Sequence, residues 1–156
     1  MRPRGYIDTS VVGGCLDQEF GRYSERLRRD FAAGRYLAVL SDITIGELRE
    51  APPEVWQLLE QPGFAEAERV FLDDEADQLA TQYIQEGAVT EASRADAEHI
   101  AVATVQRVDM LVSWNFEHIV RLSRIRAFNA VNLKLGYPAL EIRSPLEVAC
   151  EETEDI

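Results

Sequence analysis

The segment from Ser93 to His118, SRADAEHIAVATVQRVDMLVSWNFEH, decides the predicted fold. Its first half has apolar side chains at helical spacing, namely Ile100, Ala103, Thr104 and Val108. After Asp109, the short β-branched run from Met110 to Val112 is typical of a buried strand. The segment therefore predicts a helix, a tight turn and a strand, which is the repeating unit of a parallel α/β sheet.

Two polar side chains of this segment are predicted to meet. Asp96 falls in the first turn of the helix, where an acid is favoured by the positive end of the helix dipole. Asn115 follows Val112, the last apolar residue of the strand, by three positions (115 − 112 = 3). Ligands collect at the carboxyl ends of parallel strands. We therefore expect Asp96 and Asn115 to line one pocket.

The rest of the chain alternates between strand-like and helix-like segments. Strands are predicted near residues 5–7, 36–40, 110–112 and 140–143, and residues 68–72 are either a further strand or a connecting segment. Helices are predicted over 15–34, 43–50, 55–61, 74–86 and 116–135. This alternation predicts a three-layer α/β/α fold with a central, mostly parallel sheet.

Length and composition indicate one domain. The chain has 156 residues, of which 46% are hydrophobic, which is enough for a single packed core. We assign residues 1–149 to this domain and residues 150–156 to an acidic C-terminal tail, which we expect to be disordered from Glu151 to Asp155.

The sequence predicts a soluble cytoplasmic protein. No apolar run approaches the length of a membrane span, and the N-terminal MRPRGY has no signal-peptide core. Cys15 and Cys150 lie far apart without a CxxC spacing, so we expect free structural thiols.

The net charge of −12 argues against a protein that binds nucleic acid by bulk electrostatics, because neutralising phosphates requires an excess of Lys and Arg. The acids are concentrated, however, in residues 54–98, and most of the cationic side chains are arginines, which suit phosphate recognition. Arginines at helical spacing, at Arg22, Arg26, Arg121 and Arg124, are candidate contacts for a polyanion, although such stripes are more often solvated faces.

Asp8 lies at the end of the first predicted strand. Asp, Ser and Thr are preferred N-cap residues, so Asp8 is either a helix cap or a ligand. A strand at the start of a parallel sheet would place Asp8 at the carboxyl edge.

Glu47 is placed inside a predicted helix between apolar neighbours. Burying a glutamate is costly unless its charge is compensated. Glu47 is therefore a better ligand candidate than Glu50, which is predicted to be exposed.

For several other side chains, we favour a structural role over a functional one. The acids from Asp73 to Asp77 are typical of a helix N-terminus, because near-consecutive acids on a helix cannot all face one ion. His99 could form a zinc pair with Asp96, but no third ligand is evident, so His99 and His118 are interpreted as structural. Trp114 could stack on a base, yet a buried aromatic anchor fits its apolar neighbours better.

Taken together, Asp8, Glu47, Asp96 and Asn115 are oxygen-donor side chains from four separate segments. Such hard donors select Mg²⁺ or Mn²⁺. Three carboxylates in one pocket repel each other without a cation, which makes a metal ion an electrostatic requirement. A phosphoaspartate phosphatase is the competing chemistry at Asp8, but the residue two positions on, where an acid is needed, is Ser10.

The ordered motifs YIDTS, ITIGEL, RADAEHIAVAT and LVSWNFEHI resemble the PIN-domain ribonucleases, in the VapC-like toxin branch, and the tail VNLKLGYPALEIRSP extends the resemblance over nearly the whole chain. The resemblance implies a Mg²⁺- or Mn²⁺-dependent endoribonuclease, with Asp8, Glu47 and Asp96 as the matching acids. It also implies a homodimer and inhibition by a small antitoxin. Thr9 and Ser113 are expected in supporting roles.

The sequence departs from the family at Asn115, where many members have an aspartate. An amide oxygen can still coordinate a metal or orient a water, but one negative charge is lost. The alternative hypothesis is therefore a catalytically degenerate PIN domain that binds RNA or a protein partner without cutting.

Overall fold

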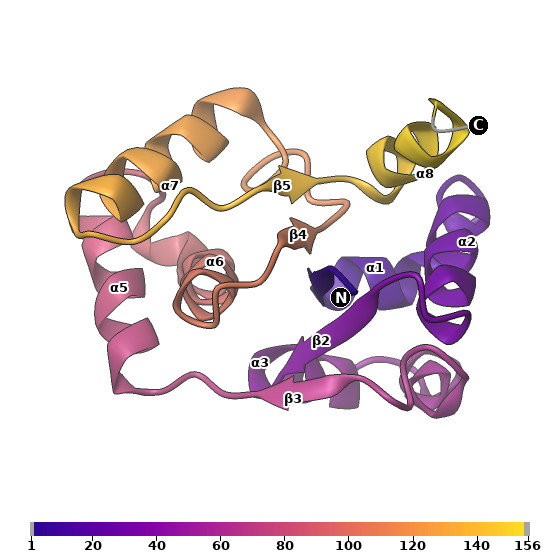
Figure 1. Cartoon of the computed structure of the whole chain (residues 1–156). Helices are drawn as coiled ribbons and strands as arrows, with labels where there is room; N and C mark the ends of the chain where they lie inside the picture. Colours follow the sequence, from indigo (N-terminus) through magenta and orange to yellow (C-terminus); the bar gives the residue numbers. More distant parts are fainter. Residues whose placement is uncertain (1, 155–156) are drawn as a thin grey trace.

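The computed structural model describes residues 2 to 154, and a five-stranded parallel sheet forms its centre (Figure 1). The strands are β1 (Arg4–Ile7), β2 (Leu37–Ser41), β3 (Glu68–Val70), β4 (Met110–Val112) and β5 (Ile142–Arg143). Their order in the sheet is β3-β2-β1-β4-β5, and every neighbouring pair is parallel. The predicted parallel α/β architecture is confirmed.

Helices cover both faces of this sheet. In the described residues they are α1 (Thr9–Gly14), α2 (Gly21–Ala32), α3 (Asp42–Arg49), α4 (Pro53–Trp56), α5 (Asp74–Gln85), α6 (Arg94–Val105), α7 (Leu122–Lys134) and α8 (Pro145–Glu154), with 3-10 turns η1 (Gln57–Glu60) and η2 (Glu91–Ser93). Figure 1 shows α5, α6 and α7 on one side of the sheet and α1, α2 and α8 on the other. The molecule therefore has three layers.

The hydrophobic core consists of two clusters, one on each face. Side chains alternate along a strand, so Tyr6 of β1 packs in the cluster with Tyr83 of α5 and Phe128 of α7. The next residue, Ile7, packs in the opposite cluster with Leu27 of α2.

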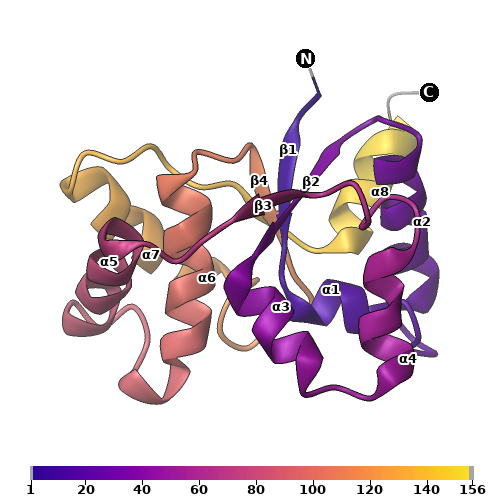
Figure 2. The ribbon, with the colours of Figure 1, turned by 90° about the horizontal axis from the view of Figure 1, so that it is seen from below.

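The carboxyl ends of the three central strands lie at one edge. Tyr6 pairs in register with Val39 of β2 and Leu111 of β4. Each strand ends within two residues of that level, and Figure 2 shows α1 and α3 leaving the sheet from this same edge. Asp8, Ser41 and Ser113 are therefore brought together by the strand register.

The helix predicted over residues 15–34 is shorter than expected. The observed α2 begins only at Gly21. The reason is Asp17, whose carboxylate accepts hydrogen bonds from the backbone N–H groups of Glu19 and Phe20 and closes a separate turn. Leu16, an apolar residue of the predicted helix, is 52% exposed in that turn.

The helix predicted from Phe116 also begins later, at Leu122. Asn115 is the cause, because its side-chain oxygen accepts from His118 N at 2.9 Å and its backbone oxygen accepts from Ile119 and Val120. These bonds hold residues 116–121 in a turn before α7.

The C-terminal segment differs from the prediction. Helix α8 runs from Pro145 to Glu154 and so includes most of the segment that was expected to be disordered. Asp155 and the side chain of Cys150 lie outside the described residues, whereas Cys15 is a free thiol as expected. Within residues 2–154, no helix is both long and apolar enough to cross a membrane.

Candidate active site

Asp8 lies at the centre of the carboxyl edge, between β1 and α1. Its Oδ1 accepts from Ser10 Oγ at 2.6 Å and from Val11 N at 3.3 Å, so Asp8 is the N-cap of α1. Its Oδ2 accepts from Ser113 Oγ at 2.6 Å, and only 5% of the residue is exposed. The prediction that Asp8 caps a helix is confirmed, and the capping carboxylate is buried at the carboxyl edge of the sheet.

The segment after β4 links Asp8 to Asp96. Ser113 Oγ accepts from Asn115 N at 2.9 Å while it donates to Asp8. The Asn115 side chain donates from Nδ2 to Asp96 Oδ1 at 3.1 Å. The predicted convergence of Asp96 and Asn115 is confirmed.

The amide of Asn115 has a defined orientation. Its oxygen accepts from the backbone N–H of His118, and its NH₂ group faces the Asp96 carboxylate. Each of these partners requires that orientation, because an N–H needs an acceptor and a carboxylate needs a donor. The role of Asn115 as a metal ligand stays a prediction, and it would require the amide to turn over.

Glu47 joins the site from α3 through a histidine. His99 Nε2 lies 2.6 Å from Glu47 Oε1. The Glu47 side chain is 41% exposed, so the expected burial among apolar residues is wrong, whereas His99 is fully enclosed in the core. Glu47 lies six residues (47 − 41 = 6) beyond Ser41, the N-cap of α3, on the helix that leaves the sheet at the same edge as Asp8.

The acids influence each other electrostatically. Burial raises the pKa of the Asp8 carboxyl, and the His99 charge and the hydrogen bonds from Ser10, Ser113 and Val11 offset only part of that rise. Burial also raises the pKa of Asp96, and the neighbouring charges of Asp8 and Glu47 add to it against the opposing His118 and His99. The charges of Asp8 and Glu47 are thus close enough to Asp96 to change its pKa.

The donor set fits a hard divalent cation. It contains carboxylates and hydroxyls and no thiolate, which is the chemistry that Mg²⁺ and Mn²⁺ prefer. The Thr9 hydroxyl, next to Asp8, is buried and has no hydrogen-bond partner, so this edge also holds an unsatisfied polar atom.

The carboxylates are not drawn together around a common point. In the part of the chain that the structure describes, no three His, Cys, Asp or Glu side chains lie together in a group that could hold a metal ion. Each acid is instead held by a protein donor: Asp8 by Ser113, Asp96 by Asn115 and Glu47 by His99. Like charges without a cation are expected to turn to such donors.

The hydrogen bonds exclude the zinc reading of His99 in this arrangement. Its Nδ1 lies 2.6 Å from Tyr6 Oη and its Nε2 faces Glu47, so neither ring nitrogen is directed at Asp96. His99 is a packed, hydrogen-bonded residue, as interpreted from the sequence, and both of its ring nitrogens are bonded within the protein. At position 10, the competing phosphatase reading needs an acid, and Ser10 instead donates to Asp8.

Two further structural readings are also confirmed. Trp114 is 7% exposed, its Nε1 donates to Ser24 Oγ at 2.8 Å, and its ring stacks on Phe20 at 4.2 Å between centroids. The exposed aromatic beside the site is instead Phe116, at 48%. Asp73 is the N-cap of α5 and accepts from Ala76 N, while the acids that follow lie in the first helical turn.

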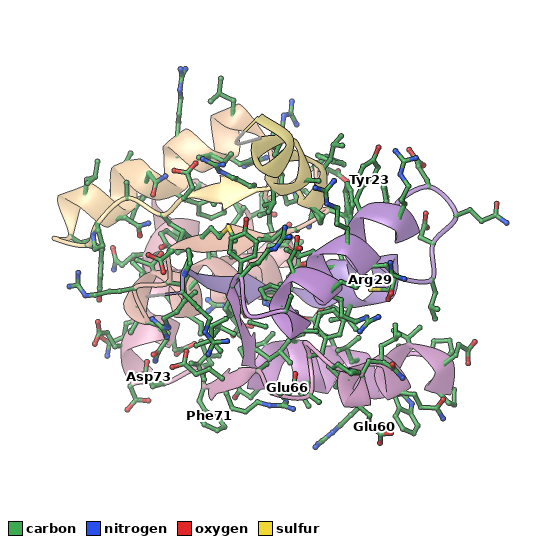
Figure 3. All side chains as sticks on the ribbon, turned by 45° about the vertical axis from the view of Figure 1, so that its right-hand side comes forward. Tyr23, Arg29, Glu60, Glu66, Phe71 and Asp73 are labelled. Carbon is green, nitrogen blue, oxygen red and sulfur yellow. The ribbon has the colours of Figure 1, made fainter. Side chains whose placement is uncertain are left out.

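The predicted RNA-contact arginines have different environments. Arg22 and Arg26 are exposed on α2 beside a hollow of about 490 Å³ that Arg29 also lines, and Figure 3 labels Arg29 and Tyr23 on this helix. Arg121 is exposed. Arg124 is half-buried and donates to Ala88 O at 2.6 Å, and this hydrogen bond connects α7 to the segment between α5 and α6.

Sequence reasoning missed Ser10 as a partner of Asp8 and missed the pairing of Tyr6 and His99 with Glu47. Ser10 could have been found, because a hydroxyl two residues after a strand-end aspartate can fold back onto it. The Tyr6–His99 pair spans 93 positions in the sequence and had no local signal.

Comparisons with known proteins give matches at the level of structure. No protein-family model matches the sequence, and no curated protein matches it. Among solved structures, VapBC2 from Rickettsia felis bound to a promoter DNA fragment has a TM-score of 0.57 at 14% identity, covering 90% of this chain and 98% of that chain.

Two other solved structures are similar. Mycobacterium tuberculosis VapC20, described as a sarcin-ricin loop cleaving toxin, has a TM-score of 0.55 at 14% identity, over 88% of this chain and 98% of that one. FitAcB from Neisseria gonorrhoeae has a TM-score of 0.55 at 17% identity, over 91% and 98%. The chain therefore has the three-layer fold of the VapC-like PIN domains, as the sequence motifs implied.

Proposed function

We propose that the protein is a Mg²⁺- or Mn²⁺-dependent endoribonuclease and the toxin of a type II toxin-antitoxin pair. The observation that carries this proposal is a set of hydrogen bonds at the carboxyl edge, which runs from Asp8 through Ser113 and Asn115 to Asp96. Glu47 is bonded to His99, which lies on the same helix as Asp96. The fold neighbours that are toxins, one of them described as cleaving the sarcin-ricin loop, support the choice of substrate class.

In this proposal the site side chains have three different roles, which are to bind the cation, to fix Asp8 and to complete the coordination shell. Asp8, Glu47 and Asp96 would hold the cation, which would make a bound water more acidic and neutralise charge on the phosphodiester. Ser10 and Ser113 fix the Asp8 carboxylate with hydrogen bonds of 2.6 Å each. Asn115 would complete the shell, either through its oxygen or by orienting Asp96.

The proposal includes partners. The exposed arginines of α2 and Arg121 are positioned to bind a phosphate backbone, which would compensate locally for the overall negative charge. Likeness to a solved toxin-antitoxin complex from Klebsiella pneumoniae supports an antitoxin partner. We propose a homodimer that acts in the cytoplasm, where RNA and the antitoxin would meet it.

The test compares the two site aspartates with a control aspartate that shares the capping role of Asp8. Asp8→Asn and Asp96→Asn are expected to abolish Mn²⁺-dependent cleavage of RNA, because each removes a carboxylate from the site. Asp73→Asn is the matched control, since Asp73 caps α5 as Asp8 caps α1 and asparagine is also a good cap. Cleavage that survives either site variant contradicts the proposed site.

Asn115 favours a second candidate, a degenerate domain that binds RNA or protein without cutting. Its amide supplies a donor to Asp96 where a fourth negative charge would attract a cation. Calorimetric titration with Mn²⁺ separates the two. Heat of binding that is lost in Glu47→Gln supports the nuclease, and no heat at millimolar Mn²⁺ supports the binding module.

A further inference from the structure

A chain of buried hydrogen bonds ends at the Glu47 carboxylate. Glu47 itself is partly exposed, but its Oε1 lies 2.6 Å from Nε2 of His99, a residue that is 3% exposed on α6. Because only one carboxylate oxygen meets the ring, the second oxygen is left for another partner.

The other ring nitrogen, Nδ1, is hydrogen-bonded to a buried hydroxyl on the sheet. His99 Nδ1 lies 2.6 Å from the hydroxyl of Tyr6 on β1, and that hydroxyl lies 2.6 Å from Ser41 Oγ at the end of β2. Ser41 Oγ also accepts from Thr44 N, which fixes it as the N-cap of α3. Tyr6, Ser41 and Thr44 are all fully buried. The His99 ring is therefore fixed by hydrogen bonds on both sides, to Tyr6 of the sheet and to Glu47.

The position of one proton follows from this arrangement. A carboxylate only accepts, so Nε2 must carry the proton that is donated to Glu47. This holds whether or not Nδ1 is also protonated, because the Tyr6 hydroxyl can donate to Nδ1 or accept from it. Burial raises the pKa of Tyr6 well above its usual range and keeps that hydroxyl protonated.

We propose that His99 is a positioning residue for Glu47, holding one carboxylate oxygen through Nε2–H so that the other oxygen faces the site in a fixed direction. The purpose of this positioning, to present a cation ligand, rests on the proposed function. Such support matters for Glu47, because its side chain is 41% exposed and is therefore less restricted by packing than a core side chain. Hydrogen bonds from a second layer orient metal ligands in this way.

The test uses two amides that replace different halves of the imidazole. Glutamine at position 99 can place its NH₂ near the position of Nε2, whereas asparagine reaches only the position of Nδ1. His99→Gln therefore keeps the donor to Glu47, and His99→Asn loses it. By calorimetry, His99→Asn should weaken Mn²⁺ binding by about tenfold or more, and His99→Gln by much less.

The result that overturns the proposal is equal Mn²⁺ affinity in the two variants. A merely structural histidine would give this result, since both amides leave the imidazole volume unfilled. Thermal unfolding without metal shows how much of any effect is structural, because positioning predicts that affinity and stability change independently.

A second pair of variants keeps the inference testable if position 99 tolerates no amide. Tyr6→Phe removes the hydroxyl behind the ring, and Tyr83→Phe is the control, because Tyr83 is equally buried in the same core cluster and its hydroxyl bonds Asn132 away from the site. Tyr6→Phe should weaken Mn²⁺ binding and Tyr83→Phe should not. Equal effects contradict the proposal.

A nuclear magnetic resonance readout separates this inference from the proposed function. In the metal-free protein, His99 Nε2 should carry a proton protected from exchange, and its signal should be lost in Glu47→Ala. If the wild type neither binds Mn²⁺ nor cuts RNA, the proposed function fails, while a protected proton still supports the positioning. An unprotonated Nε2 contradicts the positioning regardless of activity.

Discussion

Asn115 is the residue at which this site differs most from a four-carboxylate arrangement. Its NH₂ group donates to Asp96, and its oxygen closes the turn before α7 through His118 N. One side chain therefore stabilises an acid and shapes a loop. An aspartate at this position could keep the second bond but would exchange the first for repulsion.

Asn115→Asp should therefore destabilise the metal-free protein at neutral pH, because it removes a donor from Asp96 and adds a like charge. The same change should increase Mn²⁺ affinity, since the pocket gains a carboxylate. Thermal unfolding with and without Mn²⁺ measures both effects. Unchanged stability in both conditions would show that residue 115 does not face the acids in solution.

Asp8 predicts a pH dependence with a definite sign. Its folded-state pKa is raised above the ordinary value of 3.8, mainly by burial. The stability that its neutral form contributes is complete below that ordinary value and is lost as the pH rises through the raised value. Asp8→Asn has no such loss.

The melting-temperature difference between Asp8→Asn and the metal-free wild type should therefore grow in favour of the variant from about pH 4 upward. Comparing the two proteins at each pH cancels the titrating groups that do not interact with Asp8. His99 does interact with it, because the Asp8 charge helps to raise the pKa of His99. A difference that shrinks as the pH rises would mean that the fold favours the ionised Asp8 carboxylate.

At the scale of elements, the helices and strands were predicted well where an apolar period and a cap coincide. Ser41 caps α3 and Asp73 caps α5 as their residue types indicate. Predictions failed where a polar side chain closed a turn inside an apolar period, at Asp17 and Asn115. Periodicity does not reveal such turns, because it records which face is apolar and not where the backbone bonds go.

Two helical glycines give opposite predictions. A Cβ at Gly46 of α3 would meet nothing within 4 Å, so Gly46→Ala should stabilise the protein by about 1 kcal/mol through helix propensity. A Cβ at Gly14 of α1 would lie 2.7 Å from Ser24 Oγ and 2.9 Å from Trp114 Nε1. Gly14→Ala should therefore destabilise by roughly 1–3 kcal/mol through overpacking.

Denaturant unfolding of both variants checks these values, and each serves as the control for the other. If Gly14→Ala is as stable as the wild type, the close packing of α1 against Trp114 is not present in solution.

At the scale of the molecule, the parallel sheet turns four distant sequence segments into one edge. The parallel architecture could be predicted from alternating periods, and the placement of Asp8, Asp96 and Asn115 followed from it. The hydrogen bonds of the site could not be predicted. The Tyr6–His99–Glu47 connection joins β1, α6 and α3, and the distances between these elements depend on the packing of the whole core. The donors that hold each acid likewise emerged only with the packed fold.

The distribution of arginines predicts how RNA would bind to this acidic protein. Replacing Arg22 and Arg26 on α2 together with alanine should weaken RNA binding and reduce the slope of its salt dependence by about 2, one for each lost phosphate contact. Arg69→Ala on the edge strand β3 is the control. Equal salt slopes in the double variant and the wild type would exclude α2 as the RNA-binding face.

The central claim is that the carboxyl edge of the sheet binds a divalent cation among Asp8, Glu47 and Asp96. The most direct measurement is the anomalous scattering of a crystal soaked in Mn²⁺. The account predicts a peak bounded by these carboxylates, with His99 still bonded to Glu47. A saturated crystal with no peak at this edge, and with Asp8 still bonded to Ser113 and Asp96 to Asn115, would contradict it.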